Sequence, residues 1–459
     1  SWIRRGGLIS PFQKAIGQPD GCAEHNFLLT SIEEEAVRTK DKEVHMAFLD
    51  LTDAFGSVPH QLIWETLDKM GLDSDTITLF QDMYTNTKTV YQCNGVYSSA
   101  IDIVRGVKQG CPLSMTLFCL SIDFLIKGVE LMPHAPTIHE KEVAVLAYAD
   151  DLVILSTYNR DLQTKINRIN RLAKWAHLKF NASKCGYFST STCFPQEQMS
   201  IDGVPIPTVD ADNLYKYLGV PHGQQKRQDI SHIIDKATVD YQAILDSDLS
   251  MRQKILVLNM FILPRFTYAL RTHAVAIQSL FSPEGRQAKG KPKSNGFDKA
   301  IAQMVKKSFK FPKSTSLDFL YGNSKLGGLG VTPTLEEYLV QNINHMFRIL
   351  NSPDPLVKST SRQELISVAK YRLLSIAKVN LASALAWLSG STANLCSTPR
   401  GPATWWMRTK GAIEKSMRYC NILVRPQVQG DTVCLRLEYE SNGKTIKYLI
   451  NEANKDKLC

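Results

Sequence analysis

The sequence lacks the features that mark zinc-binding, disulfide-rich and membrane proteins. It contains 10 cysteines, but no two of them stand at the Cys-x-x-Cys spacing. Neither a zinc knuckle nor a disulfide framework is therefore indicated, and reduced structural thiols are expected. No apolar run reaches the length needed to span a membrane, and no signal peptide is visible. We expect a soluble protein of the nucleus and cytoplasm with no membrane partner.

Internal repeats and low-complexity tracts are also missing. The 459 residues are 44% hydrophobic and 21% charged, a globular composition sufficient for about two to four compact units. Lys and Arg (54) outnumber Asp and Glu (44), which gives a formal net charge of +10. This excess favours an anionic partner, nucleic acid first and an acidic membrane surface second. The sequence begins without Met inside an apparent domain, so we expect a fragment.

The most informative stretch is Val145-Leu-Ala-Tyr-Ala-Asp-Asp-Leu-Val-Ile-Leu155. Two apolar, β-favouring runs flank a short turn that carries Asp150 and Asp151. Adjacent carboxylates between apolar strands are costly to bury unless a cation offsets the lost hydration, and the usual partner is a divalent metal. The alternative is a surface hairpin with an acidic turn, because Asp is a common turn residue. This stretch alone leaves both interpretations open.

The order of expected elements indicates an α+β fold with an antiparallel sheet backed by helices. A helix is expected over 23–40, a strand over 44–51, a helix after Pro59, and a hairpin over 89–104 that turns at Asn94-Gly95. A long apolar helix, the hairpin carrying Asp150 and a helix over 159–178 follow. Helices with basic faces begin near residue 224, and 282–296 is a Gly-, Pro- and Lys-rich linker. The last expected element is a hairpin, Val433–Glu440 with Lys444–Ile450.

A third carboxylate, Asp50, ends the strand expected over 44–51. If this strand lies beside the Asp150 hairpin in one sheet, three carboxylates converge. Such a set can hold two Mg²⁺ ions, with one ion lowering the pKa of an attacking 3′-hydroxyl and the other binding the triphosphate. This chemistry agrees with a basic protein that handles nucleic acid.

Five segments resemble the ordered motifs A to E of reverse transcriptases. They are Phe48-Leu-Asp-Leu-Thr-Asp-Ala-Phe-Gly-Ser-Val-Pro59, Gly106-Val-Lys-Gln-Gly-Cys-Pro-Leu-Ser114, Ala147-Tyr-Ala-Asp-Asp151, Leu178-Lys-Phe-Asn-Ala-Ser-Lys184 and Tyr215-Lys-Tyr-Leu-Gly219. The Gly-Leu-Gly segment at 328–330 is similar to the region after the thumb in non-LTR (LINE-type) retrotransposon enzymes. The resemblance covers residues 20–222 and extends to about 335. It implies a right-hand polymerase fold with an antiparallel palm sheet, then a helical thumb and a mixed C-terminal region.

The same resemblance implies roles for individual residues. Asp50, Asp150 and Asp151 match the metal-binding catalytic residues, with the Leu51 carbonyl also near the metal. Asp53, Gln109 and Gly110 match positions beside the incoming nucleotide and template base. Phe55 matches the aromatic gate that rejects a ribose 2′-hydroxyl, or it is a core aromatic. Lys184 matches a lysine proposed as general acid for the departing pyrophosphate, or it is an ordinary solvated lysine. Gly56 departs from the pattern, because an acidic residue is common there.

The expected activity is therefore RNA-directed DNA polymerisation. Its expected partners are an RNA template, a DNA primer or target and dNTPs, and its cofactor is Mg²⁺ (two ions), with Mn²⁺ as substitute. Target-primed reverse transcription is implied by the resemblance, and no endonuclease motif is present. The expected parts are partial fingers and palm (1–222), thumb and basic linker (223–335) and a C-terminal helical region ending in a β-hairpin (336–459). The alternative is an inert, domesticated or decayed copy that only binds RNA.

Overall fold

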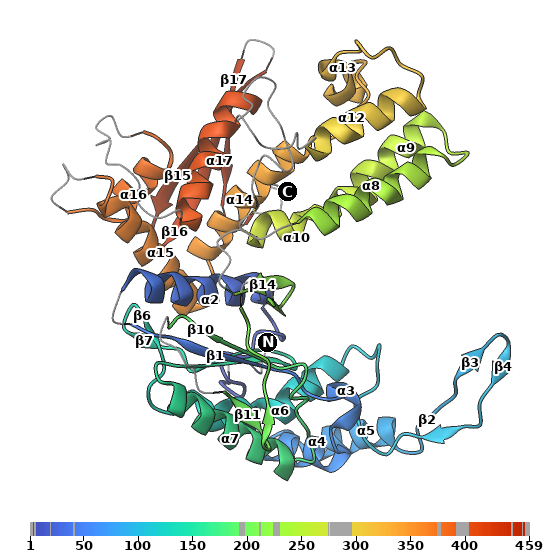
Figure 1. Ribbon diagram of the computed structural model, residues 1–459, viewed down its shortest axis with the longest axis vertical. Helices are drawn as coiled ribbons and strands as arrows, with labels where there is room; N and C mark the ends of the chain where they lie inside the picture. The colour runs from blue at the N-terminus through green and yellow to red at the C-terminus, as the bar shows by residue number, and fades with distance from the viewer. Residues whose placement is uncertain are drawn as a thin grey trace. The chain divides into compact units, whose positions relative to one another are not determined.

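The computed structural model describes most of the chain in two compact units, Ser1–Gln225 and Lys226–Cys459 (Figure 1). It does not describe residues 1–2, 4–5, 19, 40–41, 192–197, 211–212, 224–229, 274, 276–295, 374–377, 392–403, 442–443, 452 and 455–459. All but the last residue of the expected linker 282–296, and two residues of the turn in the last hairpin, lie outside the described part. The finer division into three parts stays a prediction.

The first unit is built on a four-stranded sheet whose neighbours are all antiparallel. Its order is β10-β1-β9-β8, formed by Gly186–Ser189, His45–Leu49, Asp151–Ser156 and Val145–Tyr148. β1 is buried along its whole length, as expected of a continuous apolar run with helices on both faces. In Figure 1, α2 (Gly21–Arg38) lies on one side of this sheet, and α6 (Ser114–Glu130) and α7 (Asn159–Trp175) lie on the other.

Alternate residues of the strands form one hydrophobic core with α6 and α7. Ala47 and Leu49 of β1 and Leu152 and Ile154 of β9 belong to it. The remaining elements of the unit are α3 (Ala54–Ser57), α4 (His60–Lys69), α5 (Ser74–Tyr84), β2 (Lys88–Thr89), β3 (Gln92–Cys93), β4 (Val96–Tyr97), β5 (Ile101–Asp102), β6 (Thr137–Ile138), β7 (Lys141–Glu142), β11 (Ser200–Ile201), β12 (Val204–Pro205), β13 (Tyr215–Tyr217) and β14 (Val220–His222). The α+β prediction is confirmed, and so is the hairpin over 89–104, with Asn94 and Gly95 both at positive φ.

The second unit begins as a set of helices. These are α8 (Ser231–Leu245), α9 (Met251–Val257), the π-helical turn η1 (Leu258–Ile262), α10 (Pro264–Thr272), α12 (Phe297–Ser308), α13 (Leu317–Tyr321), the 3-10 turn η2 (Ser324–Leu326), α14 (Thr334–Leu350), α15 (Pro355–Lys370), α16 (Leu381–Leu388) and α17 (Trp405–Cys420). Trp405 and Trp406 are 7% and 1% exposed. These two tryptophans are therefore core residues and not a surface for stacking bases.

The chain ends in a three-stranded sheet, which corrects the expectation of a final hairpin alone. β16 (Thr432–Ser441) and β17 (Lys444–Ile450) pair as expected, and β15 (Ile422–Gln429) adds a third strand. Pro426 hid this strand from sequence reasoning, because proline cannot donate to a ladder. The structure accommodates it because β15 is an edge strand.

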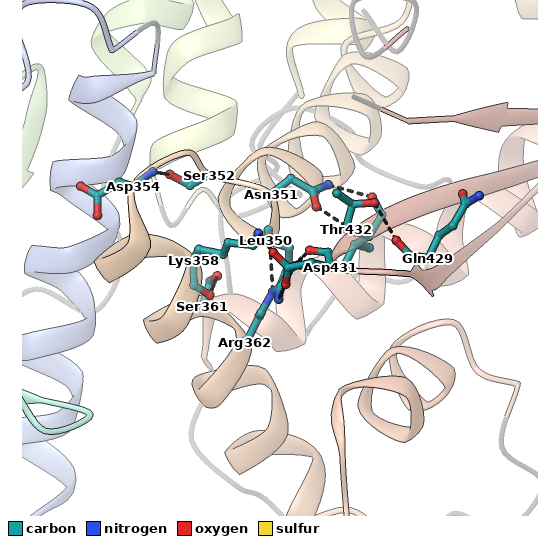
Figure 2. Close-up of polar contacts among 11 residues, drawn as sticks. Leu350, Asn351, Ser352, Asp354, Lys358, Ser361, Arg362, Gln429, Asp431 and Thr432 are labelled. Atoms are coloured by element: carbon teal, nitrogen blue, oxygen red, sulfur yellow. Dashed lines mark hydrogen bonds and ion pairs between the residues drawn. The ribbon is translucent and has the colours of Figure 1, made fainter. Parts of the chain in front are cut away.

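Side chains from α14 and α15 hold the turn between β15 and β16 in place (Figure 2). Lys358 Nζ and Arg362 Nη1 lie 2.6 and 2.9 Å from the Asp431 carboxylate. Asn351 accepts the Val433 backbone N–H at 2.8 Å and donates to the Val433 carbonyl at 2.7 Å. Because one amide satisfies both backbone groups of a strand residue, it fixes the position of β16 against the helices.

Replacing Asp298 by Ala is expected to lower the free energy of unfolding by about 2–3 kcal/mol, because buried N–H groups would lose their acceptor. Asp298 of α12 is 6% exposed and accepts the Thr334 backbone N–H (2.9 Å) and hydroxyl (2.6 Å) and the Leu335 N–H (3.4 Å) at the start of α14. Denaturant unfolding measures the loss. Asp298→Asn retains an acceptor and should lose less; equal losses would contradict the capping role.

Candidate active site

The turn between β8 and β9 carries two of the predicted site residues. Tyr148 pairs with Asp151, so Ala149 and Asp150 form a two-residue turn, called the Asp150 turn below. Ala149 has φ +51°, a left-handed conformation suited to such turns. Asp150 and Asp151 are both half-buried. The turn is thus set into the body of the unit, unlike an ordinary acidic surface hairpin.

The third carboxylate comes from the neighbouring strand. Leu49 of β1 pairs with Leu152 of β9, so the antiparallel register continued by one residue sets Asp50 opposite Asp151. Residues opposite each other on adjacent strands have Cβ atoms about 5 Å apart. The tertiary structure therefore brings Asp50, Asp150 and Asp151 to one end of the sheet, although about a hundred residues separate them in sequence.

Burial and the nearby negative charges disfavour the charged forms of Asp150 and Asp151. Desolvation raises the pKa of Asp150, and the charge of Asp50 adds to it. Desolvation, with the charges of Asp150 and Asp50, raises the pKa of Asp151 to about 6. Within the described residues, no Lys, Arg or His forms an ion pair with any of the three. The site therefore carries negative charge without a protein cation to balance it.

The donor set suits a hard divalent cation, since three carboxylates supply oxygen ligands of the kind that Mg²⁺ binds. As the side chains stand, however, no three His, Cys, Asp or Glu residues among those described form a group that could hold a metal ion. The carboxylates share one end of the sheet without being closed into a ligand cage. Asp50, Leu51, Asp150 and Asp151 as metal ligands remain a prediction.

The segment that resembles motif D extends the sheet beside Asp50. The Asn181 N–H donates to the Asp50 carbonyl at 2.9 Å, and the Asp50 N–H donates to Cys185 Sγ at 3.4 Å. Leu51 is buried and bridges Phe180. Lys184 lies in the same loop with its side chain exposed. Lys184 therefore belongs to the segment that pairs with Asp50, but among the described residues no ion pair joins it to the three carboxylates.

The segments that resemble motifs A and B contact each other through glycines. A Cβ on Gly106 would lie 2.7 Å from Gly56 Cα, and a Cβ on Gly56 would collide with the Asp53 carboxylate. The Val107 N–H donates to the Phe55 carbonyl at 2.8 Å. A side chain at position 56 would therefore have to displace the Asp53 carboxylate, and a side chain at position 106 would collide with the Gly56 backbone.

The other residues predicted to contact the nucleotide lie in the two segments 48–59 and 106–114, which meet at Gly56 and Gly106. Asp53, Gln109 and Gly110 are exposed, as residues that meet a substrate must be. The ring of Phe55 is half-buried and stacks on Phe118 of α6, with centroids 4.3 Å apart. Phe55 therefore packs against the core while retaining an accessible side, which is compatible with both interpretations of this residue.

Tyr215, in the segment that resembles motif E, is a neighbour of the site that sequence reasoning quoted without assigning a role. Its ring stacks on Phe48 with centroids 4.5 Å apart. Burial raises its pKa, and the charges of Asp50, Asp150 and Asp151 add to that effect. The motif itself was the signal in the sequence, but the proximity of Tyr215 to the carboxylates depends on how β13 folds back onto β1.

An antiparallel sheet with backing helices and carboxylates at the ends of adjacent strands is the arrangement that the motif resemblance predicts for a polymerase palm. Residues 3–222 match the family model described as reverse transcriptase (RNA-dependent DNA polymerase). This part of the chain is therefore similar to reverse transcriptases. The match agrees with the enzyme class predicted from the motifs.

Among known proteins, the chain is similar to Pol polyproteins of R2 retrotransposable elements. It is 26% identical over 354 residues to that of Nasonia vitripennis (75% of this chain, 33% of the relative) and 26% identical over 332 residues to one of Popillia japonica (71% and 44%). The R2DM polyprotein of Drosophila melanogaster is 25% identical (70% and 29%). These relatives confirm the resemblance to non-LTR retrotransposon enzymes. The chain spans about a third of the length of the first of them.

Solved telomerase structures are weakly similar. Telomerase of Candida tropicalis with a fragment of telomeric RNA gives a TM-score of 0.33 at 12% identity, over 76% of this chain and 53% of that chain. Its apo form gives 0.35 at 10% identity, over 78% and 59%. A likeness at this level carries no argument about the site. Separately, none of the helices in the described ranges is long and apolar enough to cross a membrane.

Proposed function

We propose that this chain is an RNA-directed DNA polymerase that extends a DNA 3′ end on an RNA template. The observation that carries the proposal is the meeting of Asp50, Asp150 and Asp151 at one end of the sheet, in a region that matches the reverse transcriptase model. No Lys, Arg or His among the described residues pairs with them. A group of half-buried negative charges lowers the stability of the fold unless a bound cation offsets it, so such a group indicates a cation-binding site. The resemblance of the motifs to non-LTR retrotransposon enzymes makes target-primed synthesis on nicked DNA the proposed setting.

Asp50, Asp150, Asp151 and the Leu51 carbonyl would hold Mg²⁺, with Mn²⁺ as substitute. When bound, two such ions supply a lowered pKa for the primer 3′-hydroxyl and charge compensation for the triphosphate. The chain's own residues position the reactants around them. Gln109 and Gly110 are exposed in the loop before α6 and would contact the template base and the nucleotide. Asp53 would lie beside the incoming nucleotide.

Two further residues would act on the nucleotide. The Phe55 ring would exclude a ribose 2′-hydroxyl, because its stacking on Phe118 keeps the ring from moving aside. Lys184 would deliver a proton to the leaving pyrophosphate, and its exposure leaves its charged form well solvated until substrate arrives.

Helices of the second unit would follow the backbone of the template–primer duplex through basic side chains. Part of this charge is engaged within the unit: Lys254 donates to the Leu245 carbonyl, and Arg265 pairs with Asp240. Arg252 is exposed. We therefore expect Arg252 to contribute more to duplex binding than the other two, in the manner of a salt-sensitive phosphate contact.

Primer extension tests the function directly. The purified chain is incubated with a DNA primer annealed to an RNA template, dNTPs and Mg²⁺. Template-dependent extension that stops on chelation is expected. Absence of extension on any primed RNA, together with retained RNA binding, would contradict the proposal and favour the inert RNA-binding alternative.

Replacing Phe55 by Val is expected to reduce discrimination between dNTPs and rNTPs by about 10- to 100-fold, because the pocket would gain room for a hydroxyl. The measurement is the ratio of kcat/KM for the two nucleotide types. Phe124→Val is the matched control, because Phe124 is also a partly buried aromatic packed against the same core but makes its ring contact with Trp175, so the ratio should stay at the wild-type value. Unchanged sugar selectivity in Phe55→Val would identify Phe55 as a core aromatic only.

A further inference from the structure

Residues 8–15, called the N-terminal strap, run beside β8 and reach the Asp150 turn. The Lys14 N–H donates to the Ala147 carbonyl at 2.9 Å, and the Ala147 N–H donates to the Phe12 carbonyl at 3.0 Å. Gln13 and Ala147 form an isolated parallel bridge. This pairing sets Gln13 beside the turn, although 136 residues separate it from Ala149 in the chain.

The carboxamide of Gln13 binds both backbone groups of one turn residue. Its Oε1 accepts the Ala149 N–H at 2.8 Å, and its Nε2 donates to the Ala149 carbonyl at 3.3 Å. Gln13 is fully buried, so water does not compete for these bonds. Ala149 immediately precedes Asp150 and has φ +51°, a conformation that residues other than glycine rarely adopt. An external group that satisfies both of its backbone atoms therefore stabilises that conformation.

The strap that carries Gln13 is itself anchored on two helices. On α6, Asp123 Oδ1 accepts the Ser10 N–H at 2.9 Å and Glu130 Oε2 accepts the Ser10 hydroxyl at 2.6 Å. On α2, Glu24 forms a buried ion pair of 2.8 Å with Lys14. Gln13 can fix the turn only if its own backbone is fixed. The contacts of Ser10 and Lys14, which flank Gln13 in the sequence, fix it.

We propose that Gln13 is a positioning residue for polymerisation, which clamps Ala149 and thereby sets where Asp150 and Asp151 present their carboxylates. This inference rests on the proposed function, because it concerns the same carboxylates. Gln13 touches no reacting atom and acts only through the backbone of the turn. Glutamine suits the task because it offers a donor and an acceptor without adding charge beside three carboxylates.

Another glutamine of the same unit makes the same pair of bonds elsewhere. Gln163 Nε2 donates to the Ser200 carbonyl and Gln163 Oε1 accepts the Ser200 N–H, both at 2.9 Å. Ser200 belongs to β11, which is not part of the four-stranded sheet. Gln163→Met is therefore a matched control for Gln13→Met, because each substitution preserves side-chain length and removes two bonds to one backbone residue. Each also removes a further bond, which joins Gln13 to the Ala15 N–H at 3.2 Å and Gln163 to the Asn167 side chain at 2.9 Å.

Hydrogen exchange tests the clamp independently of catalysis. In the metal-free full chain, Gln13→Met should accelerate exchange in peptides covering 145–152 by at least about tenfold, because the Ala149 amide loses its buried acceptor. Gln163→Met should leave these peptides unchanged and accelerate exchange around residue 200. Unchanged protection of 145–152 in Gln13→Met would overturn the proposal.

Steady-state extension tests the consequence. Gln13→Met should lower kcat by about 10- to 100-fold, as expected for misplaced reacting groups, while the KM for dNTP changes far less. Gln163→Met should retain the wild-type kcat. Normal kcat in Gln13→Met beside an active wild type would refute positioning by Gln13. An inactive wild type would instead refute the proposed function, and the exchange result would still decide whether the clamp exists.

Gln13→Asn provides a second variant should Gln13→Met fail to fold. Asparagine keeps a donor and an acceptor but is one methylene shorter, so from the same strap it cannot reach both backbone groups of Ala149. It should accelerate exchange in peptides covering 145–152 and lower kcat in the same direction as Gln13→Met. Wild-type exchange and wild-type kcat in Gln13→Asn would overturn the proposal.

Discussion

Asp150→Asn is expected to lower kcat/KM for RNA-templated primer extension by at least about 10³-fold, as for the loss of a group that acts only on the transition state. Asparagine keeps the size of the side chain and its place in the turn but removes the negative charge. In the proposed mechanism that charge is required for binding the divalent ions, and no neighbouring group among the described residues replaces it. Single-nucleotide extension under saturating template and primer measures the effect.

Asp161→Asn is the matched control for this loss. Asp161, on α7, is also a half-buried aspartate of the first unit. It forms an ion pair with His134 at 2.8 Å and does not belong to the group of Asp50, Asp150 and Asp151. Its variant should retain extension within about threefold, since a partly exposed pair contributes little. Asp150→Asn that extends primers as well as Asp161→Asn would refute the assignment of the site.

Asp151→Asn is expected to abolish extension while making the metal-free protein more stable at pH 7.5. Burial and the nearby charges raise the pKa of Asp151 to about 6 from an ordinary value of 3.8. The folded state therefore binds more protons than the unfolded state between these values, and stability falls as the pH rises through this window. Above pH 6, the ionised Asp151 lowers the free energy of unfolding by at most about 3 kcal/mol. Because the group is half-buried, solvent screening reduces this loss to about 1–2 kcal/mol.

The neutral amide removes that cost, so the gain should be full at pH 7.5 and should shrink as the pH falls from about 6 towards 3.8. Denaturant unfolding at both ends of the window measures it. Millimolar Mg²⁺ should raise the Tm of the wild type more than that of the variant, because the wild type offers three carboxylates to the ions and the variant only two. A metal-free Asp151→Asn variant that is less stable than the wild type at pH 7.5 would contradict the destabilisation of Asp151 by burial and by the charges of Asp50 and Asp150.

Much of the first unit was predictable because its local signals agree with one another. β1 and the β8–β9 hairpin are apolar runs bounded by Asp residues, and α7 has a strongly periodic apolar face. The hairpin over 89–104 followed from Asn94-Gly95, a pair that accepts positive φ. β15 escaped prediction because Pro426 argues against a strand locally, and only its position at the sheet edge makes it tolerable.

The sequence by itself determined which residue types are available for chemistry: five ordered motifs, the paired Asp150 and Asp151, and Asp50 at the end of an apolar run. Tertiary structure alone decided how they meet. The register of β1 on β9 brings Asp50 opposite Asp151, β13 folds Tyr215 against Phe48, and the strap sets Gln13 on Ala149. Such contacts join residues far apart in the chain, and local periodicity carries no information about them, because loop closure and packing of the whole unit select the partner.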